Sequence, residues 1–335
     1  MIIAIPIKLT QMNLHSFLFK IILLLLLALV VISISLLCGS TGCALNADTT
    51  DLLLQLRLPR VLAAFAVGGL LALAGALLQL LLRNPLADPY VLGLSSGAAA
   101  GGMLFTVLMP VAWAAYSLQL GALCGAGLAT LLLFILARGV LLRQVSLVST
   151  SSGIKLILIG VMISSACGAV ITLMLSLLPD QQLRSMVFWL MGDLESVEWI
   201  WPAWVILLFS LAWAWRHATA LNILAHGEVT AQLLGLPVRR LRIMILLVAS
   251  VATAAAVTVA GAIGFIGLVV PHALRLVMGN NQHHLLPASV LVGGIALTLA
   301  DLFARTIVAP LQLPVGVITA LIGVPVFLVL LVRSR

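Results

Sequence analysis

Long apolar runs alternate with short polar stretches along nearly the whole chain. A transmembrane helix needs about 20 predominantly apolar residues, and runs of about this length recur from end to end. We place ten predicted spans at residues 17–38, 59–82, 91–110, 113–138, 154–178, 199–216, 241–261, 264–279, 285–304 and 314–332. The eighth is short and contains Pro271, so we expect a bent or partial span there. The pattern predicts an all-α integral membrane protein with a single transmembrane domain, residues 1–335.

The longest polar interruption in the second half of the chain covers residues 222–242, named here the coupling segment. A helix of about two turns in it would carry one apolar stripe, formed by Val229, Leu233 and Leu236. Glu228 would lie in the first turn, where the helix dipole favours a negative charge, and Gly235 and Pro237 would end the helix. From the residues alone, a docking surface for a partner and an interfacial helix lying on lipid headgroups both remain open.

The composition excludes a soluble protein. Of the 335 residues, 63% are hydrophobic and 8% are charged, with a mean hydropathy of +1.29, whereas soluble domains carry about 25% charged residues. The net charge of +8 does not indicate nucleic-acid binding, because the basic residues stand singly between apolar runs. We therefore expect membrane lipid, and no nucleic acid, around this chain.

The basic residues predict the orientation, because cytoplasmic loops are enriched in Lys and Arg. With a cytoplasmic N-terminus, 13 of the 17 basic residues fall on the cytoplasmic side, and Arg57, Arg60, Arg184 and Arg305 fall outside. Both termini are then cytoplasmic, and the protein belongs in the plasma (inner) membrane. Among the two longer outer segments, residues 179–198 have enough apolar character to predict a short helix near the outer surface.

The four cysteines show no metal-ligand spacing. Cys124 and Cys167 lie inside apolar runs and are expected to pack there. Cys38 and Cys43 flank a predicted outer boundary, where a disulfide is possible but not required by the pattern.

Small residues are frequent in the spans, and the fifth span has the densest small polar content. In the other spans, glycines four apart favour close helix packing. The polar positions of the fifth span that could line a pathway are Ser164, Ser165, Gly168, Thr172 and Ser176. A helix along a water-filled path and a helix hydrogen-bonded to its neighbours would both look like this.

The chain lacks the motifs that would power or catalyse a reaction. It has no GxxxxGK phosphate loop and no HExxH zinc motif, and its ionisable residues lie near span ends, where Asp301 and Arg305 are one turn apart and could pair. Residues 93–97 match the GxSxG pattern of hydrolases but open a transmembrane span rather than a strand-to-helix elbow. We expect no catalytic residue, cofactor or metal site. The pattern suits the membrane subunit of a machine with a separate motor, with a secondary carrier as the rival class and a pore as a third.

Several motifs resemble those of the FecCD family, the permease subunits of type II ABC importers for iron chelates and cobalamin. The resemblance runs from about Arg57 to the C-terminus. It is carried by RLPR (57–60), ALAGALLQLLLRNPLADPYVLGLSSGA (72–98), FWLMG (188–192), ILAHGEVTAQLLGLP (223–237), GAIGFIGLVVPHALRL (261–276) and LPVGVITALIGVPVFLVLL (313–331). It implies the BtuC-like permease fold, with about ten transmembrane helices and both termini cytoplasmic.

The same resemblance implies partners and mechanism. The chain would form a homodimer with the path at the subunit interface, above two cytoplasmic ABC ATPase subunits that hydrolyse ATP and below one periplasmic substrate-binding protein. An iron chelate, meaning a ferric siderophore or haem, is the expected cargo, with cobalamin as the alternative and an oxyanion such as molybdate as a remote third.

The resemblance also implies roles for particular residues. In this reading Arg57, Arg60 and Arg305 are exposed and meet acidic residues of the binding protein. The cytoplasmic gate combines Asn84, Pro85 and Leu86 with a serine segment before the fifth span that includes Ser151 and Ser152. The residues that contact the ATPase are Glu228, Val229, Gln232, Leu233, Gly235 and Leu236.

Overall fold

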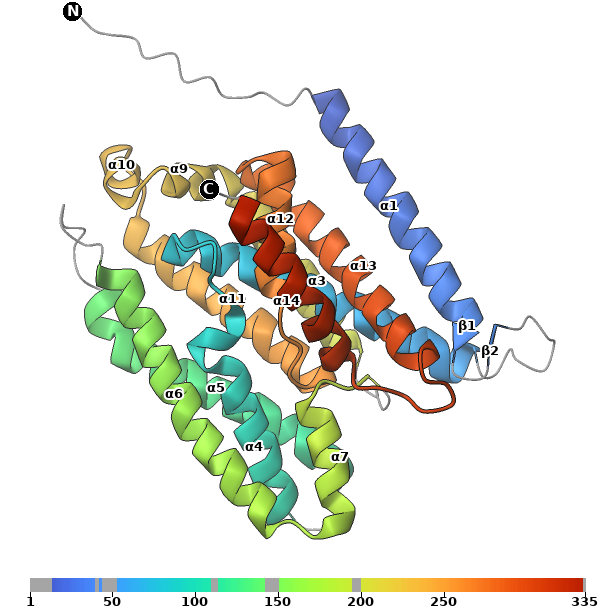
Figure 1. The fold of residues 1–335 in the computed structure, drawn as a ribbon. Helices are drawn as coiled ribbons and strands as arrows, with labels where there is room; N and C mark the ends of the chain where they lie inside the picture. Colours follow the sequence, from blue (N-terminus) through green and yellow to red (C-terminus); the bar gives the residue numbers. More distant parts are fainter. Residues whose placement is uncertain are drawn as a thin grey trace, which may run out of the picture.

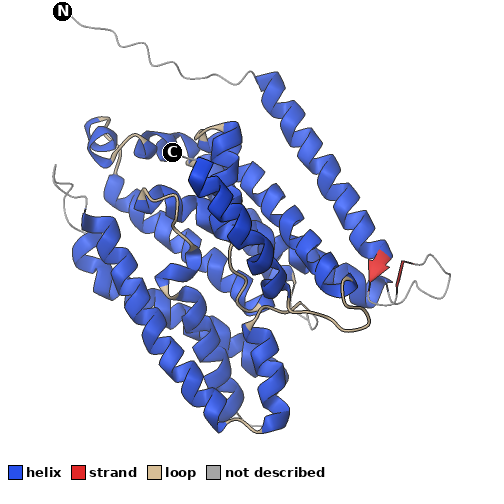
Figure 2. Cartoon of the chain, viewed as in Figure 1, coloured by secondary structure: helices blue, strands red, loops and turns tan. Residues whose placement is uncertain are grey.

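The computed structural model describes residues 14–39, 42–43, 53–109, 114–141, 151–194 and 200–333, and these form a nearly all-helical bundle (Figures 1 and 2). The longer helices are α1 (Leu14–Leu37), α3 (Leu58–Leu82), α4 (Leu94–Leu108), α5 (Ala114–Leu141), α6 (Ser151–Leu177), α8 (Trp201–Arg216), α11 (Val238–Ala260), α12 (Ile266–Met278), α13 (Gln282–Thr306) and α14 (Val315–Arg333). The shorter elements are β1 (Cys38–Gly39), β2 (Gly42–Cys43), η2 (Leu53–Arg57), η3 (Pro89–Leu92), α7 (Asp180–Leu190), α9 (Ala218–Ala225) and α10 (Glu228–Leu233).

Each of the ten predicted spans corresponds to one of the longer helices, but they are not equally able to cross a bilayer. Among the described residues, seven helices have the length and hydropathy of a span, and α8 adds an eighth that bends by 63° into α9. At 13 residues, α12 is about 20 Å long, which is less than the ~30 Å hydrocarbon core. The count of ten is therefore approximate, with α4 and α12 as the short members.

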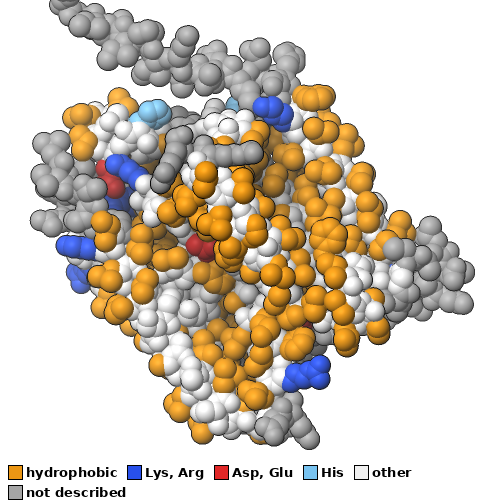
Figure 3. All heavy atoms as spheres, viewed as in Figure 1, with side chains coloured by type: hydrophobic (Ala, Val, Ile, Leu, Met, Phe, Trp, Pro, Cys, Tyr) orange, Lys and Arg blue, Asp and Glu red, His pale blue; other side chains and the backbone are white. Residues whose placement is uncertain are grey.

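Helix α3 forms the centre of the bundle. In its most apolar stretch 94% of the residues are buried, against 17% in α1, α6 and α14. It packs against α11, α12 and α13. Apolar side chains are spread over the whole face seen in Figure 3, and few charged ones lie among them. A buried central helix with apolar outer helices is the arrangement that a lipid environment permits.

Glycines set the closest helix contacts, as the sequence predicts. A Cβ on Gly68 of α3 would lie 2.2 Å from the carbonyl oxygen of Gly293 in α13. A Cβ on Gly101 of α4 would lie 2.3 Å from the carbonyl oxygen of Gly121 in α5. Because backbone meets backbone at these crossings, no larger side chain fits.

Three motif glycines from distant parts of the sequence meet at one junction. Gly192 follows α7, Gly261 ends α11, and Gly316 lies in the first turn of α14. A Cβ on Gly261 would come within 2.0 Å of the Trp189 carbonyl oxygen, and one on Gly316 within 2.0 Å of the Met191 carbonyl oxygen. Gly192 and Gly261 also have positive φ angles, of 86° and 66°, which favour glycine.

The polar segments partly depart from the prediction. The expected outer helix is present as α7, although residues 195–199 lie outside the described part of the chain. The coupling segment contains the end of α9, the short α10 and the beginning of α11. Helix α11 begins at Val238, so its first turns already carry Arg239, Arg240 and Arg242.

Candidate functional site

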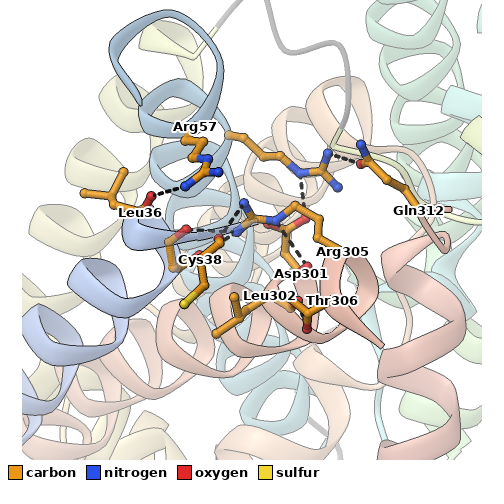
Figure 4. A network of polar contacts seen from close by, with 10 residues as sticks. Leu36, Cys38, Arg57, Asp301, Leu302, Arg305, Thr306 and Gln312 are labelled. Carbon is orange, nitrogen blue, oxygen red and sulfur yellow. Dashed lines mark hydrogen bonds and ion pairs between the residues drawn. The ribbon is translucent and has the colours of Figure 1, made fainter. Parts of the chain in front are cut away.

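One end of the bundle holds a buried group of charged side chains, which we call the arginine cluster: Arg57, Arg60, Asp301 and Arg305 (Figure 4). Arg57 ends η2, Arg60 lies in the first turn of α3, and Arg305 lies in the last turn of α13. Asp301 forms ion pairs with Arg60, at 2.8 Å from Nε to Oδ1, and with Arg305, at 3.0 Å from Nε to Oδ2. The expected pairing of Asp301 with Arg305 is confirmed, and the second pairing, with Arg60, brings α3 and α13 together.

The arginine cluster also binds the C-terminal end of α1. Arg57 donates from Nη1 to the carbonyl oxygens of Leu36 and Leu37, at 3.0 and 2.8 Å. Arg305 donates from Nη2 to the Ser35 hydroxyl at 2.7 Å and to the Ser35 carbonyl oxygen at 3.3 Å. The last carbonyls of a helix have no partner within it and form its negative end, so the two arginines satisfy them and hold α1 in place.

A small two-stranded bridge with a disulfide-bonded cysteine adjoins this contact. Cys38 is disulfide-bonded, and its backbone pairs with that of Cys43 in the two-stranded β1–β2 bridge. Of the other cysteines, Cys124 and Cys167 are free. A disulfide at Cys38, left open by the sequence, is therefore present.

The expectation that the three arginines are exposed is wrong. Arg57, Arg60 and Arg305 are 7%, 8% and 3% exposed in the single chain, because Asp301 and the end of α1 cover them. Asp301 is fully buried. With three arginines and one aspartate, the cluster has a formal charge of +2, so its burial does not neutralise it.

The coupling segment lies at the other end of α13. Asn222 of α9 accepts a hydrogen bond from the backbone N–H of Gln282, at 2.7 Å, and donates to Oδ1 of Asn281, at 3.0 Å. Gln282 begins α13 and Arg305 is near its end, about 35 Å away at 1.5 Å per residue. The arginine cluster and the start of the coupling segment therefore lie at opposite ends of one continuous helix.

Helix α10 is held at its start by an ion pair, and apolar side chains at its end are exposed. Glu228 forms an ion pair with the buried Arg242 of α11, at 3.2 Å, which fixes the start of α10. Leu233 is 84% exposed, Leu234 is 65% exposed, and Val229 is at the edge of exposure. Gln232 and Gly235 are exposed beside them.

The predicted apolar stripe is only partly correct. Leu236 is half-buried and packs against the main core rather than continuing the surface of Val229 and Leu233. The reason is that α10 ends at Leu233 and Gly235 has a φ of 79°, so Leu236 leaves the helical repeat. Leu234 takes its place on the exposed surface.

The predicted gate loop follows α3. Arg83 ends the helix in the left-handed conformation, and the Asn84 side chain accepts a hydrogen bond from the Leu86 backbone at 2.9 Å. Pro85 and Leu86 are exposed. A Cβ on Gly227, just before α10, would lie 3.8 Å from the Arg83 guanidinium, so this loop adjoins the coupling segment.

The second half of the predicted gate is less fully described. Ser151 and Ser152 begin α6, but their side chains lie outside the described part of the structure, as do residues 142–150. The closing of this segment against Asn84, Pro85 and Leu86 stays a prediction.

The polar positions of α6 mostly face away from the protomer. Ser165, Thr172 and Ser176 are exposed, whereas Ser164 and Gly168 are half-buried. The three exposed hydroxyls donate to carbonyls of their own helix, those of Val161, Gly168 and Leu173, at 3.0, 3.0 and 2.7 Å. These bonds do not tie α6 to neighbouring helices, and the polar stripe is left uncovered in the single chain.

Nothing in the sequence indicated four of the contacts at these sites. Arg60 and Asp301 are 241 positions apart, and the Asn222 contacts join segments about 60 positions apart. The fourth is a hydrogen bond from Arg60 to Gln312, which is a single polar residue next to a recognisable motif.

A multi-pass bundle with an apolar surface, a polar stripe on an outer helix and exposed leucines on a short polar segment is typical of the membrane subunit of a transporter. Residues 17–333 match the FecCD transport family. The chain is 40% identical over 299 residues to the hemin transport system permease protein HmuU of Yersinia pestis, covering 87% of each chain. It is 40% identical over 333 residues to the vitamin B12 import system permease protein BtuC of Klebsiella pneumoniae, covering 98% of this chain and 96% of that one.

Two further comparisons agree. The uncharacterised ABC transporter permease protein YvrB of Bacillus subtilis is 41% identical over 291 residues, covering 85% of this chain and 80% of that protein. A solved structure described as an inward-facing conformation of a metal-chelate type ABC transporter superposes with a TM-score of 0.84 at 31% identity, covering 94% of this chain and 99% of that one. The chain belongs to the FecCD family and has the BtuC-like ABC permease fold.

Proposed function

We propose that this chain is the permease subunit of a binding-protein-dependent ABC importer that carries an iron chelate, a ferric siderophore or haem, across the inner membrane. The observation that carries the proposal is the exposed apolar surface of α10 in a member of this family. Leu233 and Leu234 lie on a short polar segment between two apolar helices, where an unpartnered apolar pair is costly in water. A cytoplasmic ABC ATPase that covers them would supply the energy source that the chain lacks.

The orientation follows from charge and redox chemistry. The coupling segment and Arg83 are on the side where most basic residues gather, which is the cytoplasmic side by the positive-inside tendency. The disulfide-bonded Cys38 directly follows the C-terminal end of α1, on the side of the bundle away from the coupling segment, and a disulfide suits an oxidising periplasm. Both termini are then cytoplasmic, and the arginine cluster is periplasmic.

The uncovered polar stripe of α6 supports a second copy of the chain as partner. A homodimer that brings two α6 helices together would enclose a path lined by Ser164, Ser165, Gly168, Thr172 and Ser176. Bulky chelates need a wide and weakly binding cavity, and small hydroxyl side chains bonded to their own helix provide such a wall. ATP binding would then rock the two halves and the gate residues Asn84, Pro85, Leu86, Ser151 and Ser152, exposing the path to each side in turn.

The arginine cluster would meet the periplasmic substrate-binding protein. Its formal charge of +2 attracts acidic side chains and steers their approach. Because the arginines are already partly paired, docking requires a carboxylate of the partner to compete for a guanidinium edge.

Reconstitution tests the class of machine. In proteoliposomes with the ATPase and binding protein, the chain should accumulate its cargo only when ATP is supplied to the ATPase. Alone, on a sodium or proton gradient, it should accumulate nothing. Uphill uptake by the chain alone would identify a secondary carrier and end the proposal.

The cargo needs a separate test, because relatives of equal identity are named for hemin and for vitamin B12. Cobalamin import by the same machinery is therefore the second candidate. The complete importer should be offered a ferric siderophore, haem and cobalamin in parallel, with ATP hydrolysis and uptake as readouts. Uptake of cobalamin without either iron chelate would replace the first candidate with the second.

A further inference from the structure

Gln312 contacts the arginine cluster from the segment between α13 and α14. Its side-chain Oε1 accepts a hydrogen bond from Nη1 of Arg60, at 2.6 Å (Figure 4). On the other edge of the same guanidinium, Nε donates to Asp301. Gln312 is half-buried, whereas Asp301 is fully buried. The two partners of Arg60 therefore differ in charge and in access to solvent.

The outer end of the Arg60 guanidinium retains binding capacity. An arginine has five N–H donors, and its Nη1 and Nη2 groups together form an edge that fits a carboxylate. Within the described part of the chain, Nη2 of Arg60 makes no hydrogen bond, and Nη1 is bound only to the neutral amide of Gln312. Arg60 has a 10% exposed side chain, against 4% for Arg305. Arg60 is thus the more accessible of the two arginines that pair with Asp301.

We propose that Gln312 is a placeholder at Arg60: its amide oxygen occupies the position that a carboxylate oxygen of the docked binding protein takes. Asp301 is then the positioning residue, because it holds Nε and aims the Nη1–Nη2 edge outward. An arginine can bind a carboxylate through two parallel hydrogen bonds to a charged acceptor, whereas the Gln312 amide offers one neutral acceptor oxygen. A partner carboxylate can therefore displace the amide but would compete poorly with another carboxylate. This inference rests on the proposed docking role of the arginine cluster and adds the residue that regulates it.

Two substitutions with opposite expected effects test the placeholder. Gln312→Glu keeps the size of the side chain but supplies an internal carboxylate, so the affinity of the importer's own binding protein should fall by about tenfold or more. Gln312→Ala removes the competitor, so the affinity should stay the same or rise. The measurement is a binding titration of purified binding protein against the permease–ATPase complex in nanodiscs, at low and high salt.

Leu311→Glu is the matched control, because Leu311 is the exposed neighbour of Gln312 and receives the same charge. It should weaken binding only slightly at low salt, and the effect should disappear at high salt, because exposed charges are screened. The Gln312→Glu effect should persist at high salt.

Arg60→Gln distinguishes the docking role of Arg60 from the placeholder role of Gln312. If it leaves affinity unchanged, the docking role of Arg60 is wrong, whatever Gln312 does. If it weakens docking but Gln312→Glu does not, the docking role stands and the placeholder is wrong. Should Gln312→Glu lower the unfolding temperature of the complex, Gln312→Ala decides: weaker docking in that variant overturns the proposal, and equal or tighter docking supports it.

Discussion

The arginine cluster at one end of α13 and the exposed leucines beyond its other end carry opposite kinds of energetic cost. At one end, three arginines and an aspartate are buried among the ends of α1, α3 and α13. Beyond the other end, α9 leads from α13 to α10, where Leu233 and the following Leu234 are exposed. Burial of charge and exposure of apolar surface both cost free energy. Ion pairs and helix-end carbonyls offset part of the first cost within the chain, whereas nothing in the described part of the chain covers Leu233 and Leu234.

We expect the greatest loss of stability when the counter-charge of the arginine cluster, Asp301, is removed. Asp301→Ala should leave Arg60 and Arg305 buried without a carboxylate, and losing one member of a buried ion pair costs about 3–5 kcal/mol. Thermal unfolding of the purified permease should shift strongly downward. Asp301→Asn, which keeps the shape and one acceptor, should lose less. An Asp301→Ala protein as stable as wild type would mean that water already solvates the arginines.

A substitution on α10 should have a smaller effect, and this effect should appear in binding of the ATPase rather than in the stability of the permease. Leu233→Asp should leave the stability of the permease alone within about 0.5 kcal/mol, because the side chain is exposed. It should weaken association with the ATPase by about 30-fold, as expected for a central apolar contact worth about 2 kcal/mol. Co-purification and a binding titration measure this.

Thr230→Asp is the control for Leu233→Asp, since it puts the same charge at another exposed position of α10. Its effect on association should be clearly smaller. Normal ATP-driven transport by the Leu233→Asp complex, with its motor bound, would place the docking surface elsewhere.

The smallest effect should come from loss of the Asn222 hydrogen bonds that join α9 to the start of α13. Asn222→Ala removes the two contacts to Asn281 and Gln282, which should cost about 1 kcal/mol because such bonds contribute about 0.5–1.5 kcal/mol each and this site is partly exposed. Thr219→Ala, which removes a single exposed contact to His283, should cost less. Equal unfolding temperatures for both variants would show that Asn222 does not fix α9 to α13.

The fold could be predicted because the membrane leaves few alternatives. Apolar runs of bilayer length must satisfy their backbone groups internally and therefore form helices. Gly97 and Gly101 predicted a close crossing, and α4 and α5 pack there through their backbones. The shortness of α12 was predicted from the short apolar run around Pro271.

The sites were harder to predict because they depend on distant contacts and on helix ends. Spacing within one helix reveals Asp301 with Arg305, but nothing local indicates that Arg60 shares the same carboxylate. The burial of Arg57 depends on the end of α1, which is far away in sequence. The apolar stripe was misassigned at Leu236 because one residue with positive φ, Gly235, breaks the helical repeat before it.

The junction of Gly192, Gly261 and Gly316 has a mechanical consequence. Backbone atoms of three segments touch there without intervening side chains, and such contacts cannot stretch or slide by small steps. The end of α7, the turn between α11 and α12, and the start of α14 should therefore travel as one rigid body. A conformational change of the protein should therefore hinge outside this junction. A displacement of the short helix α7 should move the start of α14 with it.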